Sequence, residues 1–505
     1  MQDAAAAAPI GHDNLGSNSV CSGCRGTARR ANRDTIALPH YFCGCCCVWG
    51  GYKRTRPPTA QSNERTPSRL QWKWLIMGRS RILITPREIA GIAAGLQDGL
   101  TGLGHDVDVM LRWRHPFEYR FTEPRALLAR CAARVMIESE DSRFRKINHA
   151  VSLAVRFALL PLIAMRYDAV VYIGPDTLLR NGLDRRWLSR RGVRTVTVFC
   201  GSEARPPYMD GWFGGLGAER DQLERARAEV IINHKRVQAA ERESTYVVNH
   251  PGTAQFHEQR FVDWTILGFP TTPGPLPTRR AHAPRPSLRV LHAPSVPRMK
   301  GTEEIRAAVA ALAVEGVTLD YVEITGRPHA DVMELLGTAD LVVDQLYSDA
   351  LLPGLATEAA RSGVPVLVFG HAETLLHEIA ERAVAPTIHY HRPSRLLDEL
   401  RRVVTDDDYR MQIQTSLEAF VQGWWSPDRV AARWSLLLEG KPDDAWFDDP
   451  ADFAYVGGCA ISKQDLTTFL RAYVERFGSE GLALGHAPAT EAAILDVARN
   501  GMPEA

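Results

Sequence analysis

Two polar loops in the second half of the chain carry residues whose types and spacing fit the binding of a charged ligand. In the first, HAPSVPRMKGT, Ser295 is followed by Arg298, Lys300 and Gly301, and a segment of helical period starts at Thr302. Two cations beside a helix N-terminus suit a diphosphate, because free backbone amides and the helix dipole add to the full charges. A solvated basic turn is the alternative, since the spacing matches neither the Walker nor the dinucleotide fingerprint.

The second loop places a carboxylate near the start of a short helix. Glu358 stands in LATEAARSGVPVLVF, ahead of an apolar run that predicts a buried strand. Both carboxylate oxygens accept hydrogen bonds, so Glu358 is a candidate ligand for ribose hydroxyls. A surface glutamate favoured by the helix dipole is the alternative. The presence of Lys300 and Glu358 on two loops of one predicted sheet favours a common site.

Both loops belong to an alternating pattern of strands and helices over residues 288–369. Four apolar, β-branched runs alternate with segments of helical period, which predicts a parallel α/β sheet with ligands outside the carboxyl ends of its strands. From residue 81 a strand, a loop around Gly91, a helix and another strand open a similar domain. The glycine triplet of a dinucleotide site is missing there.

The motifs HAPSVPRMKGT, DQLY and ATEAARSGVPVLV resemble the donor domain of retaining, nucleotide-sugar-dependent glycosyltransferases of family 4, also called glycosyl transferases group 1. The resemblance spans 81–438 and implies the GT-B fold, two Rossmann-like domains facing across a cleft. It implies that Arg298 and Lys300 hold the donor diphosphate, although the usual family arginine falls at Ser295. It also implies that Glu358 holds the ribose.

The chain departs from the family pattern at one position, and three further residues are candidates on the donor side. The family commonly has a second glutamate that contacts the donor sugar, and this chain has Ala350 at that position. Asp349, or backbone amides around Gly354, would have to replace it. His329, at the end of a loop after a predicted strand, is a candidate for the nucleobase side, with a solvated loop histidine as the alternative.

On the acceptor side, the resemblance implies that the first loop, around Gly91, borders the cleft. A later strand runs into Gly201, Ser202, Glu203 and Arg205, which resembles the His-Gly-Ser-Asp-Ile-Arg segment of related glycosyltransferases. Cys200 takes the place of the histidine, and we interpret it as a buried strand-end cysteine, because no partner that would lower its pKa is evident. Glu203 and Arg205 either contact the acceptor or form a local ion pair that braces the turn.

The composition of the chain bears on whether it binds nucleic acid or a membrane. The chain has 505 residues, 45% of them hydrophobic and 24% charged, with a net charge of +1 that gives no electrostatic case for nucleic acid. No apolar run reaches the roughly 18 residues that span a bilayer. The nearest, at 151–165, contains Arg156 and Pro161 and is predicted to be a buried helix. We expect a cytoplasmic protein, with peripheral contact at the inner face of the membrane left open.

The predicted domain boundaries follow changes in composition. Residues 1–77 predict a disordered, dispensable Cys/Arg-rich extension without structural zinc, and Met77 is a candidate true start. An acceptor domain is predicted at 78–270, a Pro-rich linker at 271–287 and a donor-binding domain at 288–422. A helix at 423–440, with Trp424, Trp425 and Trp434, is expected to cross back onto the first domain. The tail at 441–505 has no assigned role.

Together these features predict a metal-independent glycosyltransferase of the hexosyltransferase type that needs no cofactor besides its nucleotide diphosphate sugar. The acceptor would be a glycan or a lipid-linked sugar, and the resemblance implies retention of the anomeric configuration. Two alternatives stay open: a non-catalytic GT-B protein that binds nucleotide sugars, and a GT-B nucleotide-sugar epimerase.

Overall fold

The computed structural model describes residues 78–502, except for gaps at 114–118, 120, 125–129, 132, 135–144, 216 and 272–286. The chain divides into two compact units, Met1–Trp72 and Lys73–Ala505, and everything below concerns the second. The predicted extension at 1–77 and nearly all of the predicted linker at 271–287 lie outside the described residues.

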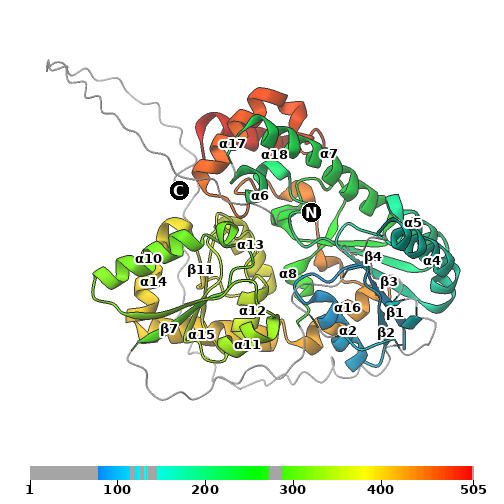
Figure 1. The fold of residues 1–505 in the computed structure, drawn as a ribbon, viewed down its shortest axis with the longest axis horizontal. Helices are drawn as coiled ribbons and strands as arrows, with labels where there is room; N and C mark the ends of the chain where they lie inside the picture. The colour runs from blue at the N-terminus through cyan, green and yellow to red at the C-terminus, as the bar shows by residue number, and fades with distance from the viewer. Residues whose placement is uncertain are drawn as a thin grey trace, which may run out of the picture. The chain divides into compact units, whose positions relative to one another are not determined.

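The first sheet of this unit has seven strands in the order β12-β6-β5-β4-β3-β1-β2 (Figure 1). Its strands are β1 (Arg81–Thr85), β2 (Asp106–Val109), β3 (Ala169–Ile173), β4 (Arg194–Val198), β5 (Tyr246–Asn249), β6 (Phe261–Asp263) and β12 (Phe447–Asp448). The first six are parallel, and β12 joins antiparallel to β6. The strand order reverses at β1, so the crevice between the β1 and β3 loops is the expected ligand position.

The central strands are apolar on both faces because helices cover both. Leu83, opposite Asp108 and Val170 in the register, packs in a cluster with residues of α4 and α5. Ile82 and Ile84, on the other face, pack in the main core with α2. A continuous apolar run is typical of parallel strands buried on both sides.

The second sheet has five parallel strands in the order β11-β10-β9-β7-β8. They are β7 (Leu288–His292), β8 (Leu319–Glu323), β9 (Leu341–Val343), β10 (Val366–Phe369) and β11 (Tyr390–His391). Its order reverses at β7, so the loops after β7 and β9 flank its switch point. The predicted architecture, two Rossmann-like α/β domains of the GT-B type with a helical C-terminal tail, is confirmed.

The helices follow the sequence in three groups. Those between strands of the first sheet are α2 (Ile92–Gly102), α4 (Arg145–Arg166), α5 (Leu183–Arg190), α6 (Gly211–Gly214), α7 (Arg220–Glu243) and α8 (Trp264–Leu267). Those of the second are α9 (Pro297–Lys300), α10 (Thr302–Val314), α11 (His329–Leu336), α12 (Gly354–Arg361), α13 (Glu373–Ala383), α14 (Leu396–Thr405) and α15 (Asp407–Gly423). The last are α16 (Pro427–Leu438), α17 (Lys463–Phe477) and α18 (Pro488–Asn500).

Helix α16 returns from the second sheet to the first, where it packs on α2 and α8. Trp434 is fully buried, with its ring 6.0 Å from that of Trp264 in an edge-on arrangement. The indole of Trp425 donates a hydrogen bond to the Thr265 carbonyl at 2.9 Å. Trp434 of α16 and Trp425, just before the helix, therefore hold this part of the chain on the first domain.

The C-terminal tail is part of the first domain. Helices α17 and α18 pack on each other, and α17 contacts α6 and the short 3-10 segment Pro207–Met209 next to α7 (Figure 1). Tyr208 donates to the Leu482 carbonyl and Arg227 to the Gly481 carbonyl, both at 3.0 Å. The tail therefore borders the loops of the first sheet.

Helix α4 differs from its prediction as a buried helix. Only 22% of the segment His149–Arg166 is buried, although by length and composition it is the one described helix apolar enough to cross a membrane. Leu160 and Ile163 are buried, while Phe157 and Met165 are 67% and 77% exposed. The prediction was wrong because apolar composition alone does not show which residues a sheet can cover.

Candidate functional site

Two adjoining cavities lie where the strand ends of the two sheets meet. The β7 cavity, of about 240 Å³, is lined by the loops after β7 and β8, the start of α12, and Ala90 and Tyr119 from the first domain. The β4 cavity, of about 330 Å³, is lined by residues 199–202 and Arg205 after β4, by 349–354 after β9, and by residues from several neighbouring loops. Ala90 and Gly354 line both, so the cavities are neighbours, and each has walls from both domains.

Lys300 is presented to the β7 cavity by the loop at the switch point of the second sheet. Its Nζ lies 3.4 Å from Asp344 Oδ1 and also donates to the Gln345 side chain. Gly301 follows in a left-handed conformation (φ 70°), and a Cβ there would lie 2.4 Å from Leu346. Only glycine fits this turn, which fixes Lys300 just before α10. Ser295 lines the same cavity.

Glu358 and His329 form a pair in the wall of the β7 cavity. His329 Nε2 lies 2.6 Å from Glu358 Oε1, and the Tyr119 ring lies 5.1 Å from the imidazole. Burial alone would lower the pKa of His329, but the hydrogen bond and charge of Glu358 outweigh it and raise that pKa. Neither the solvated histidine nor the isolated surface glutamate of the alternative interpretations describes this geometry.

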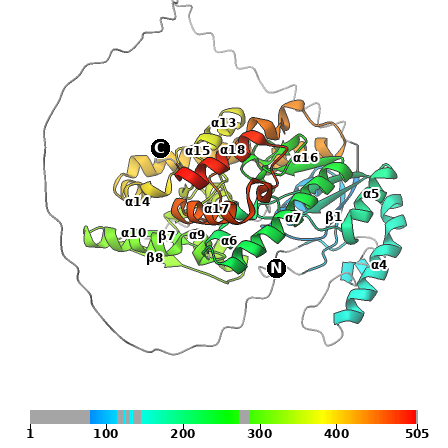
Figure 2. The same ribbon diagram turned by 90° about the horizontal axis from the view of Figure 1, so that it is seen from above.

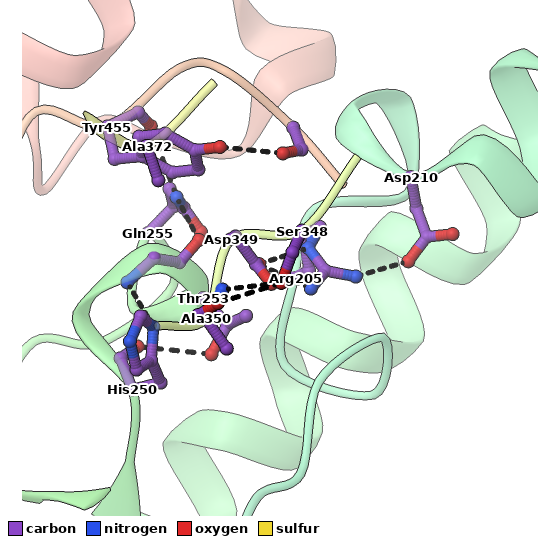
Figure 3. Close-up of polar contacts among 12 residues, drawn as sticks. Arg205, Asp210, His250, Thr253, Gln255, Ser348, Asp349, Ala350, Ala372 and Tyr455 are labelled. Atoms are coloured by element: carbon purple, nitrogen blue, oxygen red, sulfur yellow. Dashed lines mark hydrogen bonds and ion pairs between the residues drawn. The ribbon is translucent and has the colours of Figure 1, made fainter. Parts of the chain in front are cut away.

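Arg205 and Asp349 join the two domains beside the β4 cavity (Figure 3). Arg205 Nε donates to Asp349 Oδ2 at 3.1 Å, and Arg205 NH1 donates to Asp210 Oδ2 at 2.7 Å. All three side chains are almost completely buried. The arginine therefore neutralises two carboxylates, one from each side of the cleft.

A local ion pair between Glu203 and Arg205, one of the two interpretations of this turn, is absent from the described structure. Glu203 instead accepts a hydrogen bond from the Cys200 backbone N–H at 2.6 Å, and its buried position raises its pKa. Cys200 itself lines the β4 cavity, and burial raises the pKa of its thiol well above the usual value. This agrees with an unreactive strand-end cysteine.

Of the remaining predicted residues, some line the two cavities and others do not. Gly201 and Ser202 line the β4 cavity, and Gly354 lines both cavities. Gly91 adopts a left-handed conformation (φ 82°) under the Tyr119 ring. Arg298, however, donates to the Gly211 carbonyl at 2.9 Å and is not among the described residues that line either cavity. The structure thus brings Lys300, but not Arg298, to the predicted diphosphate position.

Two titratable residues in the loops after β1 and β5, the buried Glu88 and the half-buried His250, were not predicted. Glu88 accepts backbone hydrogen bonds from Ala93 and Ala94 at the start of α2, yet burial raises its pKa to about 7. His250 lines the β4 cavity, where its Nδ1 accepts from the Gly252 N–H at 3.0 Å, and burial lowers its pKa to about 4. Its Nε2 has no hydrogen-bond partner among the described residues. The sequence feature that could have revealed them is a titratable side chain within three residues of the end of an apolar strand.

The tail also reaches the site. Cys459 and Ala460 line the β4 cavity, and Cys459 bridges to Asp210. Away from both cavities, His234, Glu258 and His486 form the one group of described residues with the geometry to hold a metal ion, their ligand atoms lying within 4.8 Å of one another. Within the described residues, no such group lies in the cleft itself.

Comparison with known proteins gives fold-level likeness only. No family model and no curated protein matches the chain. Among solved structures, a sucrose-phosphate synthase from Thermosynechococcus elongatus is 12% identical, with 72% of this chain and 99% of that chain covered and a TM-score of 0.43. Anabaena HepE in complex with UDP and glucose is 11% identical (72% and 100% covered, TM-score 0.42). WaaG, a glycosyltransferase involved in lipopolysaccharide biosynthesis, is 14% identical (71% and 100% covered, TM-score 0.40).

Proposed function

We propose that the chain is a glycosyltransferase that binds a nucleotide diphosphate sugar in the β7 cavity and transfers the sugar across the cleft. The observation that carries this proposal is the position of Lys300 and Glu358 in one cavity at the switch point of the second sheet. A lysine ammonium suits a diphosphate, and a carboxylate suits the vicinal hydroxyls of ribose. Their separation by the loops of one sheet allows one ligand to contact both.

Lys300 has the central role in the proposed chemistry. When the bond between sugar and diphosphate breaks, negative charge grows on the leaving diphosphate, and a fixed cation lowers the energy of that state. Asp344 and Gln345 hold the ammonium in place before the donor binds. Preorganisation of this kind avoids reorganisation during the reaction.

The nucleoside half would lie against Glu358, His329 and Tyr119. Glu358 shares its carboxylate with His329, so the ribose would find an oriented acceptor rather than a mobile one. The ring of Tyr119, which comes from the first domain, would close over this part of the donor. Binding the nucleoside therefore favours contact between the domains.

The sugar itself would enter the β4 cavity. Its polar wall includes Arg205, Asp349 and His250, and the neutral His250 ring, with Nδ1 as acceptor, carries its proton on Nε2. The acceptor, a glycan or a lipid-linked sugar, would approach from the side of Gly201 and Ser202. Retention of configuration and independence of metal and cofactor remain part of the proposal, carried by the resemblance in sequence.

A second candidate is a protein that binds nucleotide sugars without transfer. It is favoured by Ala350, which lines the β4 cavity where the family commonly has a glutamate, and by Asp349, whose carboxylate is neutralised by Arg205. Nucleoside diphosphate release from a panel of nucleotide sugars, with and without candidate acceptors, separates the two. The enzyme releases nucleoside diphosphate, and the binding protein raises its melting temperature with a donor but releases none.

A further inference from the structure

A cluster of two histidines and one glutamate brings together three separate parts of the chain. His234 belongs to α7, Glu258 to the loop between β5 and β6, and His486 to the turn just before α18. One ligand atom of each lies within 4.8 Å of the other two. The tail helices α17 and α18 lie on the side of the first domain where α7 runs (Figures 1 and 2). The cluster therefore connects the C-terminal tail to two elements of the first domain.

Gln238, one turn after His234 on α7, shows that two of these side chains turn acceptor atoms toward each other. Its Nε2 lies 3.3 Å from His234 Nε2 and 2.6 Å from Glu258 Oε1. An amide NH2 group only donates, so His234 Nε2 carries a lone pair rather than a proton. Burial, together with the neighbouring His486, lowers the pKa of His234 and keeps its ring neutral at pH 7. The amide nitrogen thus lies between two acceptors, where a cation would bind.

A backbone carbonyl sets the tautomer of His486. Its Nε2 donates to the Gln255 carbonyl at 3.0 Å, which leaves the lone pair on Nδ1. Metal-binding histidines commonly donate their other ring N–H to such a carbonyl, and this contact fixes the ring. The ring centroids of His486 and His234 are 5.6 Å apart. Two imidazoles that bind one zinc ion at about 2.0–2.1 Å have centroids roughly 5 Å apart, so the two rings are already near that separation.

The third ligand, Glu258, is anchored to α7 through its backbone. Glu241 of α7 accepts hydrogen bonds from the N–H groups of Glu258 and Gln259, both at 3.0 Å. The side chain of Glu258 is 44% exposed, and its Oε1 lies 4.0 Å from His234 Nε2. Two ligand atoms on a tetrahedral zinc ion stand about 3.4 Å apart. A small rotation of this exposed carboxylate closes the difference.

We propose that His234, Glu258 and His486 bind one zinc ion, which ties the tail to the first domain. Zinc accepts imidazole nitrogen and carboxylate oxygen, and water completes its tetrahedron at this partly exposed position. The ion displaces the Gln238 amide from between its two acceptors. Magnesium and calcium are disfavoured, because they prefer oxygen and two of the three ligands are nitrogen. The three residues lie outside the lining of both cavities, so this structural ion does not depend on the proposed transferase activity.

The zinc ion would stabilise a part of the chain that contributes to the candidate site. Cys459 and Ala460, at the start of the tail, line the β4 cavity, and α17 and α18 follow them and pack on each other. His486 lies in the connection between these two helices. A metal bound there cross-links the connection to α7 and to the β5–β6 loop. Since the three ligands come together only in the folded chain, zinc should raise its melting temperature.

Calorimetric titration of the full chain with zinc chloride, under reducing conditions, tests the proposal. His486→Gln keeps a side-chain N–H for the Gln255 carbonyl but removes the Nδ1 lone pair. Changes outside the direct ligands of a metal cost about 10- to 100-fold in affinity, so loss of this ligand should cost at least about 100-fold. His234→Ala should have the same effect. His377→Ala removes an exposed histidine of α13 and, as the matched control, should leave the affinity unchanged.

The comparison between variants also accounts for zinc bound elsewhere. Six cysteines at positions 21–47 are present in the parent and in every variant, so any zinc that they bind is the same in all of them. Melting temperatures without metal confirm that the variants are folded. Equal zinc affinity in the parent, His486→Gln and His234→Ala would overturn the proposal, and so would binding at millimolar zinc alone.

Hydrogen exchange of the full chain locates the ion. Zinc should slow exchange in α7 and in residues 479–500 of the parent, but not of His486→Gln. Magnesium chloride at the same concentration should slow neither segment. The melting temperature should rise with zinc in the parent and in His377→Ala, and EDTA should reverse the rise. Slower exchange confined to other segments, or an equal rise in His486→Gln, would place the zinc elsewhere and overturn the proposal.

Discussion

Replacement of Lys300 by alanine is the most informative single change in the site. The ammonium lies at the switch point of the second sheet and contacts Asp344 and Gln345. Removing it takes one positive charge from the place where the donor diphosphate should bind. It leaves the nucleoside wall around Glu358 intact, so the change separates the two halves of the ligand.

The expected loss of diphosphate affinity in Lys300→Ala comes from two effects. Loss of a hydrogen bond to a charged group costs about 1.5–3 kcal/mol, which corresponds to roughly 10- to 150-fold in Kd. Asp344 is 1% exposed, and its Oδ2 has no partner among the described residues, so Lys300→Ala also leaves a buried carboxylate that repels the diphosphate. Lys300→Ala with Asp344→Asn removes this repulsion and should bind the diphosphate better than Lys300→Ala alone.

Calorimetric titration with a nucleoside diphosphate and with the matching nucleoside is the assay. Lys300→Ala should weaken binding of the diphosphate and leave binding of the nucleoside nearly unchanged. Arg298→Ala is the matched control, because Arg298 contacts the Gly211 carbonyl instead of the cavity and should cost less. If Lys300→Ala binds the diphosphate as well as the parent does, or if Arg298→Ala costs more, the diphosphate position is wrong.

Four further predictions concern the surrounding residues. Glu358→Gln should weaken binding of the nucleoside and of the diphosphate alike in calorimetry, and an NMR titration should show a lower pKa for His329. The His329–Glu358 pair contributes fully to stability below the usual histidine pKa near 6.5, and this contribution is lost as pH rises through the raised pKa. Ala350→Glu should alter turnover or sugar choice in a product-release assay while nucleoside affinity stays the same. Glu88→Gln should flatten the fall in melting temperature that the parent shows as pH rises from 4.5 toward 7, because the folded state prefers the protonated acid. Arg205→Leu should lower the free energy of unfolding in urea by about 3–5 kcal/mol, since it leaves two buried carboxylates unpaired.

The sequence predicted the parts of the site that depend on strand order. Lys300 and Glu358 follow strands of one parallel sheet, and the carboxyl ends of such strands share an edge, so periodicity was sufficient to place them together. His329 belonged to the same edge, but its contact with Glu358 requires knowing how two loops fold over each other. That depends on tertiary packing, which local spacing does not contain.

The features that the sequence did not predict involve residues far apart in the chain. Arg205 pairs with Asp349, 144 positions away, rather than with Glu203 two positions before it. A charge pattern shows only near partners, and burial of the arginine between domains decided which carboxylates it neutralises. The exposed apolar side chains of α4 were missed for a related reason, because an apolar helix of this length is buried in most soluble proteins.

The central claim is that the β7 cavity binds the nucleotide diphosphate part of a sugar donor. Melting temperatures measured with a panel of nucleotide diphosphate sugars test it most directly, using the parent chain and a variant that carries both Lys300→Ala and Glu358→Ala. We predict that at least one donor raises the melting temperature of the parent and that this increase disappears in the variant. An increase of the same size in the variant, or none in the parent with any nucleotide sugar, would contradict the claim.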